Sequence, residues 1–500
     1  MREATSPEPT ENGVWILAAT ILGSSMAFID GTVVNVALPA IQHTFHSTGS
    51  DVQWVVESYA LLLASLLLAG GAMGDLYGRK KIFVLGVILF AAGSIWCGLA
   101  GTMSALILAR GAQGIGAALL VPGSLALISA SFPISTRGSA IGTWSGFTAM
   151  TAAVGPVLGG ALVQYASWRW VFLINIPIAV VVVAITTLKV PESRHEEMSQ
   201  ALDWLGALLA TVGLGSITYA LIESSSIGSH PGIAAIVGVV SLVAFFVTEA
   251  RSKSPMIRLS LFRSRNFSGA NLLTFFLYGA FGGVLFFLPL NLMQVQHYAP
   301  TQAGGALLPL ILLISFLSRW SGGLIARYGA RLPLTIGPLI VAVGFLLFLR
   351  PGIGGSYATT LLPPVLILGI GMAVCVAPLT TAVMNAVPVS ESGVASAVNN
   401  AVSRIAGLLA IAVFGLVLYA AFSHNLTHRL DALSISSSER KNVDDQRSRL
   451  AAIETHNPQA QRAIAESFVF GYRRVLWIAV ALSIASSLSA ALLLEAKEAS

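Results

Sequence analysis

The chain has 500 residues, of which 55% are hydrophobic and only 10% are charged, and its mean hydropathy is +0.80. An average globular chain is about 25% charged, so this composition excludes a soluble protein, whose surface would need far more polar residues. The net charge of +6 implies no nucleic-acid partner, because loops between apolar runs hold most of the basic residues.

Long apolar runs follow one another along the chain. A membrane-spanning helix needs roughly 20 mostly apolar residues, whereas a barrel strand needs about 10 residues of alternating polarity, a pattern that does not occur here. We therefore predict an all-α membrane protein with fourteen spans. The spans are expected at about 14–38, 52–73, 82–100, 104–131, 138–163, 169–188, 204–224, 232–250, 267–292, 303–326, 332–350, 357–385, 392–422 and 467–494.

The first run is too long for the core of a signal peptide, and no small-residue cleavage site follows it, so a retained span is expected. Cys97 and Cys375 lie inside predicted spans. A disulfide framework is therefore not expected, and each cysteine is interpreted as a small buried apolar residue.

The distribution of Lys and Arg predicts the orientation in the membrane. The short loops on the side of both termini include Arg79, Lys80 and Arg251, whereas the short loops of the other side carry Arg169 and Arg350. We therefore expect a protein of the inner or plasma membrane with both termini on the cytoplasmic side. The loop at about 423–466 is then extracellular, and its Ala-rich second half is a candidate helix.

Two loops show an internal repeat. "GAMGDLYGRKK" at 71–81 and "GGLIARYGARL" at 322–332 each join the second and third spans of a six-span block. This predicts a bundle at 1–188, two inserted helices at 189–266 and a second bundle at 267–500, an arrangement typical of transporters. The first loop is either a topology-setting basic loop or a conformational latch, and its recurrence favours the latch. The latch residues are Gly71, Asp75, Gly78, Arg79 and Lys80.

Several motifs in order resemble the major facilitator superfamily, and in particular its fourteen-span drug:proton antiporters. They are the loop 71–81, "FIDGTVVNVALP" at 28–39, "RGAQGIGAA" at 110–118 and "GPVLGG" at 155–160. The last is similar to the antiporter motif, here Gly155, Pro156, Gly159 and Gly160. The sequence departs from the family pattern at Thr151, where a glycine is usual, and the second loop lacks the acidic residue. The resemblance implies that protons drive the export of lipophilic, often cationic, compounds.

Two carboxylates lie within predicted spans. Asp30 is roughly 13 Å from the outer end of its span, near the middle of the bilayer, where a charge costs on the order of 3 kcal/mol. We expect Asp30 to face a protein-lined or watery cavity, and an apolar environment would favour its protonated form, as a proton carrier requires. Glu57 lies nearer the outer end, where it either binds a cationic substrate, carries a second proton, or reaches the outer surface.

Arg110 lies at a depth similar to that of Glu57. We expect it to form an ion pair or a hydrogen-bonded switch with Asp30 or Glu57, so that protonation of the acid releases the arginine or the substrate. Other candidates for substrate contact are aromatic or polar residues of the spans, each with simple packing as the alternative. They are Tyr59, Trp144, Phe147, Phe275, Tyr278, Asn385, Asn399 and Arg404.

An enzyme is not expected, because the chain has no phosphate-binding "GxxxxGK[ST]" motif and no His or Cys cluster with metal-ligand spacing. We expect no cofactor and no metal, and a monomer. The sequence favours a proton-coupled exporter. The alternatives are an exporter of a lipid or secondary metabolite and, less favoured, an importer or uniporter of a nutrient with the same fold.

Overall fold

The computed structural model describes residues 13–193, 203–225, 229–252, 255–387, 392–433 and 435–495, and all regular elements in these ranges are helices. The first group is α1 (Gly13–Phe45), α2 (Gly49–Tyr77), α3 (Arg79–Leu99), α4 (Met103–Ser131), α5 (Ile134–Tyr165), α6 (Trp170–Leu173) and α7 (Asn175–Lys189). The second is α8 (Trp204–Ile222), η1 (Glu223–Ser225), α9 (Pro231–Arg251) and η2 (Leu259–Arg263). The third is α10 (Arg265–Leu290), η3 (Asn291–Val295), α11 (Pro300–Gly305), α12 (Leu308–Tyr328), α13 (Arg331–Leu347), α14 (Tyr357–Thr360), α15 (Leu362–Asn385), α16 (Ser392–Asp431), α17 (Ser437–Asp445), η5 (Arg447–Ala452) and α18 (Pro458–Leu493).

The prediction of an all-α membrane protein is confirmed for the described residues. These residues contain twelve helices that are long and apolar enough to cross a membrane. Two shorter apolar stretches, Val154–Tyr165 within α5 and Arg331–Leu347 (α13), occur at the remaining two predicted spans. A total of fourteen spans therefore stays a prediction.

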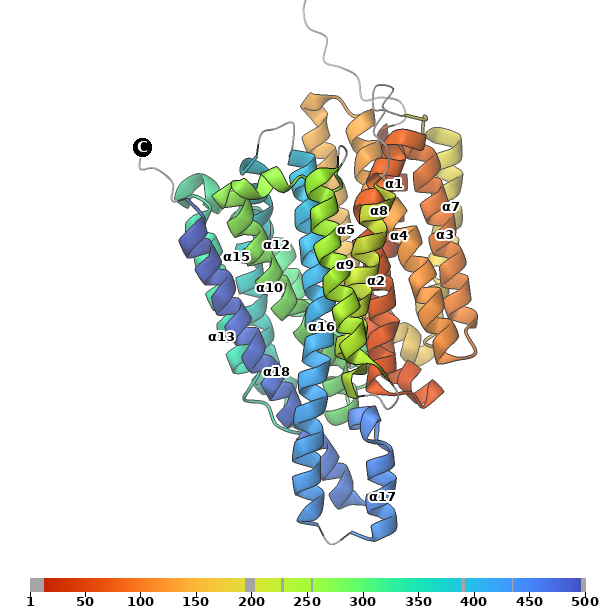
Figure 1. Cartoon of the computed structure of the whole chain (residues 1–500), viewed down its shortest axis with the longest axis vertical. Helices are drawn as coiled ribbons and strands as arrows, with labels where there is room; N and C mark the ends of the chain where they lie inside the picture. The colour runs from red at the N-terminus through yellow and green to blue at the C-terminus, as the bar shows by residue number, and fades with distance from the viewer. Residues whose placement is uncertain are drawn as a thin grey trace, which may run out of the picture.

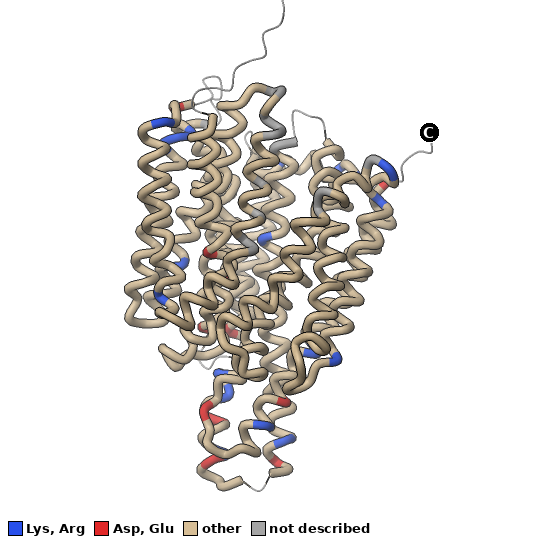
Figure 2. Tube along the Cα trace, turned by 180° about the vertical axis from the view of Figure 1, so that it is seen from behind, with Lys and Arg blue, Asp and Glu red and all other residues tan. Residues whose placement is uncertain are grey.

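The helices form two bundles that stand side by side (Figure 1). In one bundle α4 packs on α2 and α3, and α5 packs on α1; in the other, α15 packs on α12 and α13, and α10 packs on α16 and α18. The inserted helices α8 and α9 pack on each other, and α8 also contacts α2 and α16, one from each bundle. The indole of Trp54 fixes α8 to α2 by donating a hydrogen bond to Glu223 at 2.9 Å. Figure 2 shows that Lys, Arg, Asp and Glu gather at the ends of the helices, with few along the middle.

Capping residues set several helix boundaries. Thr48 and Asp51 form a reciprocal capping box at the start of α2, in which each side chain accepts a hydrogen bond from the other residue's backbone. The side chains of Ser264 and Asn457 cap the starts of α10 and α18 by accepting hydrogen bonds from backbone N–H groups of the first turn. These polar residues satisfy N–H groups that the helix itself leaves unpaired.

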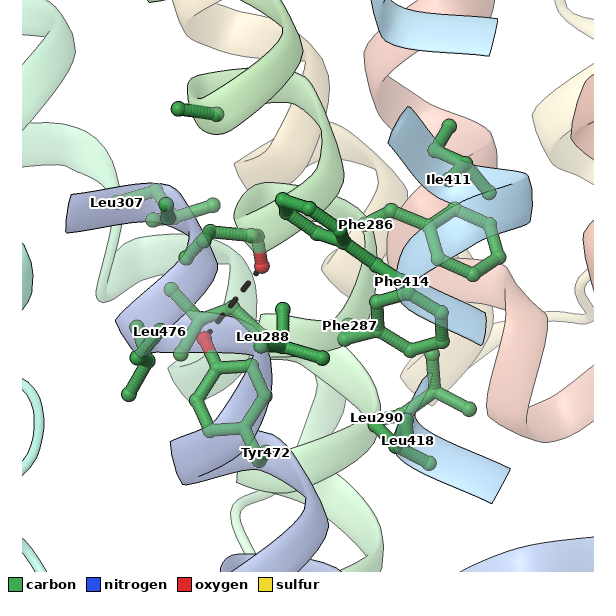
Figure 3. Packing of buried hydrophobic residues seen from close by; sticks show 14 of the residues in the cluster. Phe286, Phe287, Leu288, Leu290, Leu307, Ile411, Phe414, Leu418, Tyr472 and Leu476 are labelled. Atoms are coloured by element: carbon green, nitrogen blue, oxygen red, sulfur yellow. Dashed lines mark hydrogen bonds between the residues drawn. The ribbon is translucent and has the colours of Figure 1, made fainter. Parts of the chain in front are cut away.

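The core of the second bundle is aromatic. Phe286 and Phe287 of α10 pack against Phe414 of α16, and the Tyr472 hydroxyl of α18 donates to the Val284 carbonyl at 3.4 Å (Figure 3). Because these side chains interdigitate across three helices, they hold α10, α16 and α18 together as one unit.

The segment 423–466, expected as a loop, is largely helical. The helix α16 continues to Asp431, α17 and η5 follow, and α18 already begins at Pro458, so that the two long helices project beyond the bundle (Figure 1). An ion pair between Arg429 and Glu466 joins them. We call this projection the extension. The start of α1 and the end of α18 both lie at the end of the molecule opposite to the extension.

The two bundles meet at the end that carries the extension. Gln42 of the first bundle donates to the Arg449 carbonyl at 3.1 Å and accepts from Gln294 at 2.8 Å. Leu450, in a backbone conformation with φ of 58°, packs on Gly49. A non-glycine residue with positive φ is uncommon, so surrounding contacts must hold it there.

Glycines allow a second close contact between the bundles, at the same end. A Cβ on Gly160 of α5 would lie 2.8 Å from Cα of Thr301, and a Cβ on Gly304 of α11 would lie 2.7 Å from the carbonyl carbon of Pro156. Both distances are too short for any side chain. Helices α5 and α11 therefore approach each other only because both positions are glycine.

We predict that Gly160→Ala separates the bundles at this end. The added methyl group meets backbone atoms of α11, and such overpacking costs about 1–3 kcal/mol. The measurement is the disulfide yield of the pair Gln164→Cys and Thr301→Cys, whose native side chains are 2.6 Å apart. The yield should fall several-fold in Gly160→Ala and stay unchanged in the control Gly142→Ala, where a Cβ meets nothing within 4 Å. Equal yields in both variants would contradict the prediction.

Candidate functional site

The centre of the candidate site is an ion pair inside the first bundle. Asp30 of α1 and Arg110 of α4 are 0% and 1% exposed, and a carboxylate oxygen of Asp30 lies 2.5 Å from an Arg110 Nη1. The expected partner of Arg110 was Asp30 or Glu57, and the structure forms the pair with Asp30. Asp30 therefore points into the protein and not toward lipid.

Gln113 completes the hydrogen bonding of this pair. Its Nε2 donates to the other Asp30 oxygen at 2.8 Å, and its Oε1 accepts from Arg110 at 2.6 Å. Nε2 also reaches the Ser94 hydroxyl at 2.9 Å, to which Asn175 donates at 3.3 Å. Helix α4 places Arg110 and Gln113 on one face because residues three apart are neighbours.

The sequence analysis did not assign functional roles to Gln113, Ser94 or Asn175. The i,i+3 spacing of Gln113 from Arg110 was a usable signal. The sequence contains no comparable signal for Ser94 and Asn175, because a single polar residue in α3 or α7 does not indicate which side chains of other helices lie next to it.

Arg110 also binds α2. Its Nε donates to the Val55 carbonyl at 2.9 Å, and its guanidinium lies 4.3 Å from the centre of the Tyr59 ring. Cation–π contacts of this kind contribute about 2 kcal/mol when desolvated. With Asp30, Gln113, Val55 and Tyr59 around it, Arg110 ties α1, α2 and α4 together.

Glu57 is the second buried acid, and its surroundings are very different. It is 0% exposed, and neither carboxylate oxygen has a hydrogen-bond partner in the described part of the chain. One turn before it, Gln53 packs on Gly415 of α16, and one turn after it, Leu61 packs near Gly215 of α8. Because residues four apart share a helix face, Glu57 faces the region where α2 meets α16 and α8.

Arg404 brings a charge of the second bundle close to this region. It lies near enough to Tyr59 for its charge to act on the phenol, and its Nε has no partner among the described residues. Tyr59 thus interacts with charges of both bundles, with Arg110 over its ring and with Arg404 at longer range. The structure brings together Asp30, Arg110 and Tyr59, and it places Glu57 and Arg404 on helices that pack against each other.

The remaining candidates for substrate contact have varied surroundings. Trp144 is 8% exposed and donates to Ser24 at 3.0 Å, so it contributes to the packing of α5 on α1, whereas Phe147 is 47% exposed. Phe275 and Tyr278 are half-buried on α10, and Tyr278 packs against the core.

The two asparagine candidates differ from each other. Asn399 donates to Asn271 at 3.1 Å and to Thr274 at 2.7 Å, which joins α16 to α10. Asn385 is exposed at the last position of α15, away from the level of the buried acids.

The predicted latch lies at the turn between α2 and α3. Gly78 has φ of 108°, which favours glycine, and a Cβ there would lie 2.9 Å from the Glu192 carboxylate. Glu192 accepts from the Lys80 backbone N–H at 3.0 Å, and the Arg79 N–H binds the Ser193 carbonyl at 2.9 Å. These bonds cap α3 with residues after α7, a role of Glu192 that the sequence analysis missed. Gly71 is half-buried on α2, and the Asp75 side chain lies outside the described residues.

The antiporter motif packs on the helix that carries Asp30. A Cβ on Gly155 would lie 3.1 Å from the Thr32 Cβ, and one on Gly159 would lie 2.9 Å from the Val33 carbonyl oxygen. Gly160 and Pro156 face α11 instead. The motif therefore links α1 on one side to the second bundle on the other.

Cys97 and Cys375 are free and buried, as expected. In the described ranges, His, Cys, Asp and Glu form no group of three that would hold a metal ion.

Comparison with known proteins identifies the family. The family model of the Major Facilitator Superfamily matches residues 20–411. The chain is 37% identical over 420 residues to the multidrug resistance protein Stp of Mycobacterium tuberculosis, covering 83% of this chain and 78% of the relative. It is 32% identical over 406 residues to the tetracenomycin C resistance and export protein of Streptomyces glaucescens (80% and 75%), and 32% identical over 424 residues to the puromycin resistance protein pur8 of Streptomyces alboniger (83% and 84%).

Solved structures show the same fold. A bacterial homologue of the human lysosomal transporter Spinster has a TM-score of 0.68 at 19% identity, covering 97% of this chain and 98% of that one. The POT family transporter PepTSo has a TM-score of 0.66 at 14% identity, with the same coverage. The matching family model and the relatives in drug resistance show that the chain belongs to the major facilitator superfamily, as a multi-pass membrane transporter of the drug-efflux type.

Proposed function

We propose that this transporter is a proton-driven antiporter that exports lipophilic, cationic compounds from the cytoplasm. In this proposal it acts as a monomer with fourteen spans, and both termini lie in the cytoplasm. The observation that carries it is the contrast between two buried acids of the first bundle. Asp30 has hydrogen-bond partners on both carboxylate oxygens, whereas Glu57 has none among the residues that the structure describes.

Asp30 is the proposed proton carrier. Its two carboxylate oxygens accept hydrogen bonds from Arg110 and from the Gln113 amide. A proton arriving at Asp30 neutralises the carboxylate, weakens its attraction for Arg110, and leaves the buried guanidinium in need of another partner. The two protonation states therefore favour different helix arrangements, which is the condition for coupling.

Glu57 is the proposed substrate carboxylate. A buried acid without hydrogen bonds is costly to ionise, and a lipophilic cation would supply the missing charge. Tyr59, two residues further along α2, contacts Arg110 with its ring and lies within range of the charge of Arg404.

The α2 backbone provides a physical link between the two acids. Arg110 binds the Val55 carbonyl two residues before Glu57 and the Tyr59 ring two residues after it. A change in the position of Arg110 acts on α2 on both sides of Glu57. Proton uptake at Asp30 and cation release at Glu57 are thereby coupled without direct contact between the acids.

The contacts between the bundles support the direction of access in this state. The described hydrogen bonds that join the two bundles, such as Gln42 to Arg449 and Thr301 to Gln164, lie at the extension end. That end is closed here. If the termini are cytoplasmic, the closed end is the extracellular one, and an exported compound would enter from the opposite, cytoplasmic side.

We predict that Asp30→Asn abolishes proton-driven transport of cationic and neutral compounds alike, because an amide cannot exchange a proton with the gradient. Initial rates in inverted vesicles under an imposed pH gradient should fall by more than about tenfold. Glu495→Gln, the same exchange of chemistry at the exposed end of α18, is the matched control and should keep normal rates. Proton-driven efflux at the normal rate in the folded Asp30→Asn variant would refute the mechanism.

We predict that Glu57→Gln selectively weakens the binding of cationic substrates. Loss of the charged partner costs about 2 kcal/mol, or roughly thirtyfold in Kd, for a cation and little for a neutral compound of similar size. Competition binding with a fluorescent lipophilic cation and a neutral dye on the purified protein measures this difference. Glu57→Asp keeps the charge and should keep the preference for cations. An equal loss for both dyes would make Glu57 a general coupling residue and would favour export of a neutral lipid or secondary metabolite.

A further inference from the structure

A cavity of about 730 Å³ lies at the base of the extension, away from the transport site. It is formed by the segment after α10, the turn after α13, and the projecting parts of α16 and α18. All of its lining residues belong to the second bundle and its extension.

The cavity has an excess of positive charge. Its lining includes Arg429, Arg462 and Arg473, with Glu466 as the acid. Glu466 accepts hydrogen bonds from both Arg429 and Arg462. One carboxylate therefore serves two guanidinium groups, and the third arginine has no acid among the lining residues.

Arg473 is the least satisfied of the three. Its Nη2 donates to the Pro351 carbonyl at 3.2 Å, while its Nε is buried and has no hydrogen-bond partner in the described part of the chain. An unpaired guanidinium donor next to a cavity is costly unless an acceptor occupies that cavity.

The position of Arg473 along α18 places the cavity at the membrane boundary. From Val475 to Leu494 the chain has no Lys, Arg, Asp or Glu, which is enough residues to cross the hydrocarbon layer. Arg473 and Arg474 directly precede this run, and Arg350 follows the apolar helix α13 at the same end. Arg473, Arg474 and Arg350 therefore lie at the level of the lipid headgroups.

The rest of the lining suits a lipid more than a free ion. Val295, Ile353, Val469 and Phe470 add an apolar surface to the arginines. A lipid presents both kinds of group, a phosphate for guanidinium donors and a glycerol with acyl chains for apolar side chains. Arginine binds phosphate with a planar set of donors that lysine lacks.

We propose that this cavity binds the phosphate headgroup of an anionic phospholipid from the leaflet at the extension end. Arg473, through its unpartnered Nε, donates to the phosphate, and Phe470 and Val469 contact the apolar part of the headgroup. The acyl chains then run along the uncharged part of α18 that begins at Val475. The lipid then joins α18 to the turn after α13 and supports the extension where it leaves the membrane. This proposal does not depend on the identity of the exported compound.

The test is binding of phosphatidylglycerol to the full-length protein, measured by native mass spectrometry and by the thermal shift of the protein in nanodiscs. Phosphatidylcholine with the same acyl chains and inorganic phosphate are the comparison ligands. Phosphatidylglycerol should bind and stabilise, and Arg473→Gln should weaken its affinity by about tenfold. Arg350→Gln, which removes an exposed charge at the same level outside the cavity, should leave the affinity within about twofold.

A second variant should change the affinity for phosphatidylglycerol in the opposite direction. Glu466→Gln removes the carboxylate of the lining and frees Arg429 and Arg462, so the affinity for phosphatidylglycerol should rise. If Arg473→Gln and Arg350→Gln lowered the affinity for phosphatidylglycerol equally, the lipid would be held by general attraction to surface charge, and the proposal would be overturned. It would also be overturned if inorganic phosphate alone gave the whole stabilisation, or if phosphatidylcholine bound as well as phosphatidylglycerol.

Discussion

The ion pair between Asp30 and Arg110 is the interaction on which the first bundle depends. Both side chains are buried within helices that cross an apolar layer, and removing either partner alone would cost about 3–5 kcal/mol. The bundle must therefore bring α1, α2 and α4 close enough to satisfy them. Gly114, one turn after Arg110, makes this approach possible, because a Cβ there would lie 2.6 Å from the Tyr59 carbonyl oxygen.

The same need for close backbone approach extends to the contact between the bundles. Gly155 and Gly159 bring α5 against the helix that carries Asp30, and Gly160 brings α5 against α11. A shift of α1 is therefore passed to a helix that also contacts the second bundle. Small residues make this contact tight without side-chain interdigitation, so the two bundles can separate and rejoin at little cost in packing.

The sequence predicted the helices and the charged pair, because both follow from local rules. Apolar runs of about 20 residues locate the spans, and a lone acid such as Asp30 demands a partner. The supporting groups Ser94, Asn175 and Glu192 were not predictable, because their roles depend on which helices become neighbours. The second half of the extension was a candidate helix, but the continuation of α16 to Asp431 and the helix α17 were missed for a similar reason. Charged residues such as Arg429 read as a loop until their pairing with Glu466 of α18 is known.

The contrast between the two acids explains why one bundle contains both. Asp30 uses its two oxygens on Arg110 and Gln113, so in this state it has little capacity left for a ligand. Glu57 has its full capacity, but it lies where α2 meets the second bundle and α8, so any partner must come from between them. Arg110 contacts α2 on both sides of Glu57 and is itself held by Asp30. In the proposed mechanism the arginine is the element through which a proton at one acid changes the other, and α2 transmits the change because its backbone, and not a flexible side chain, accepts the bond.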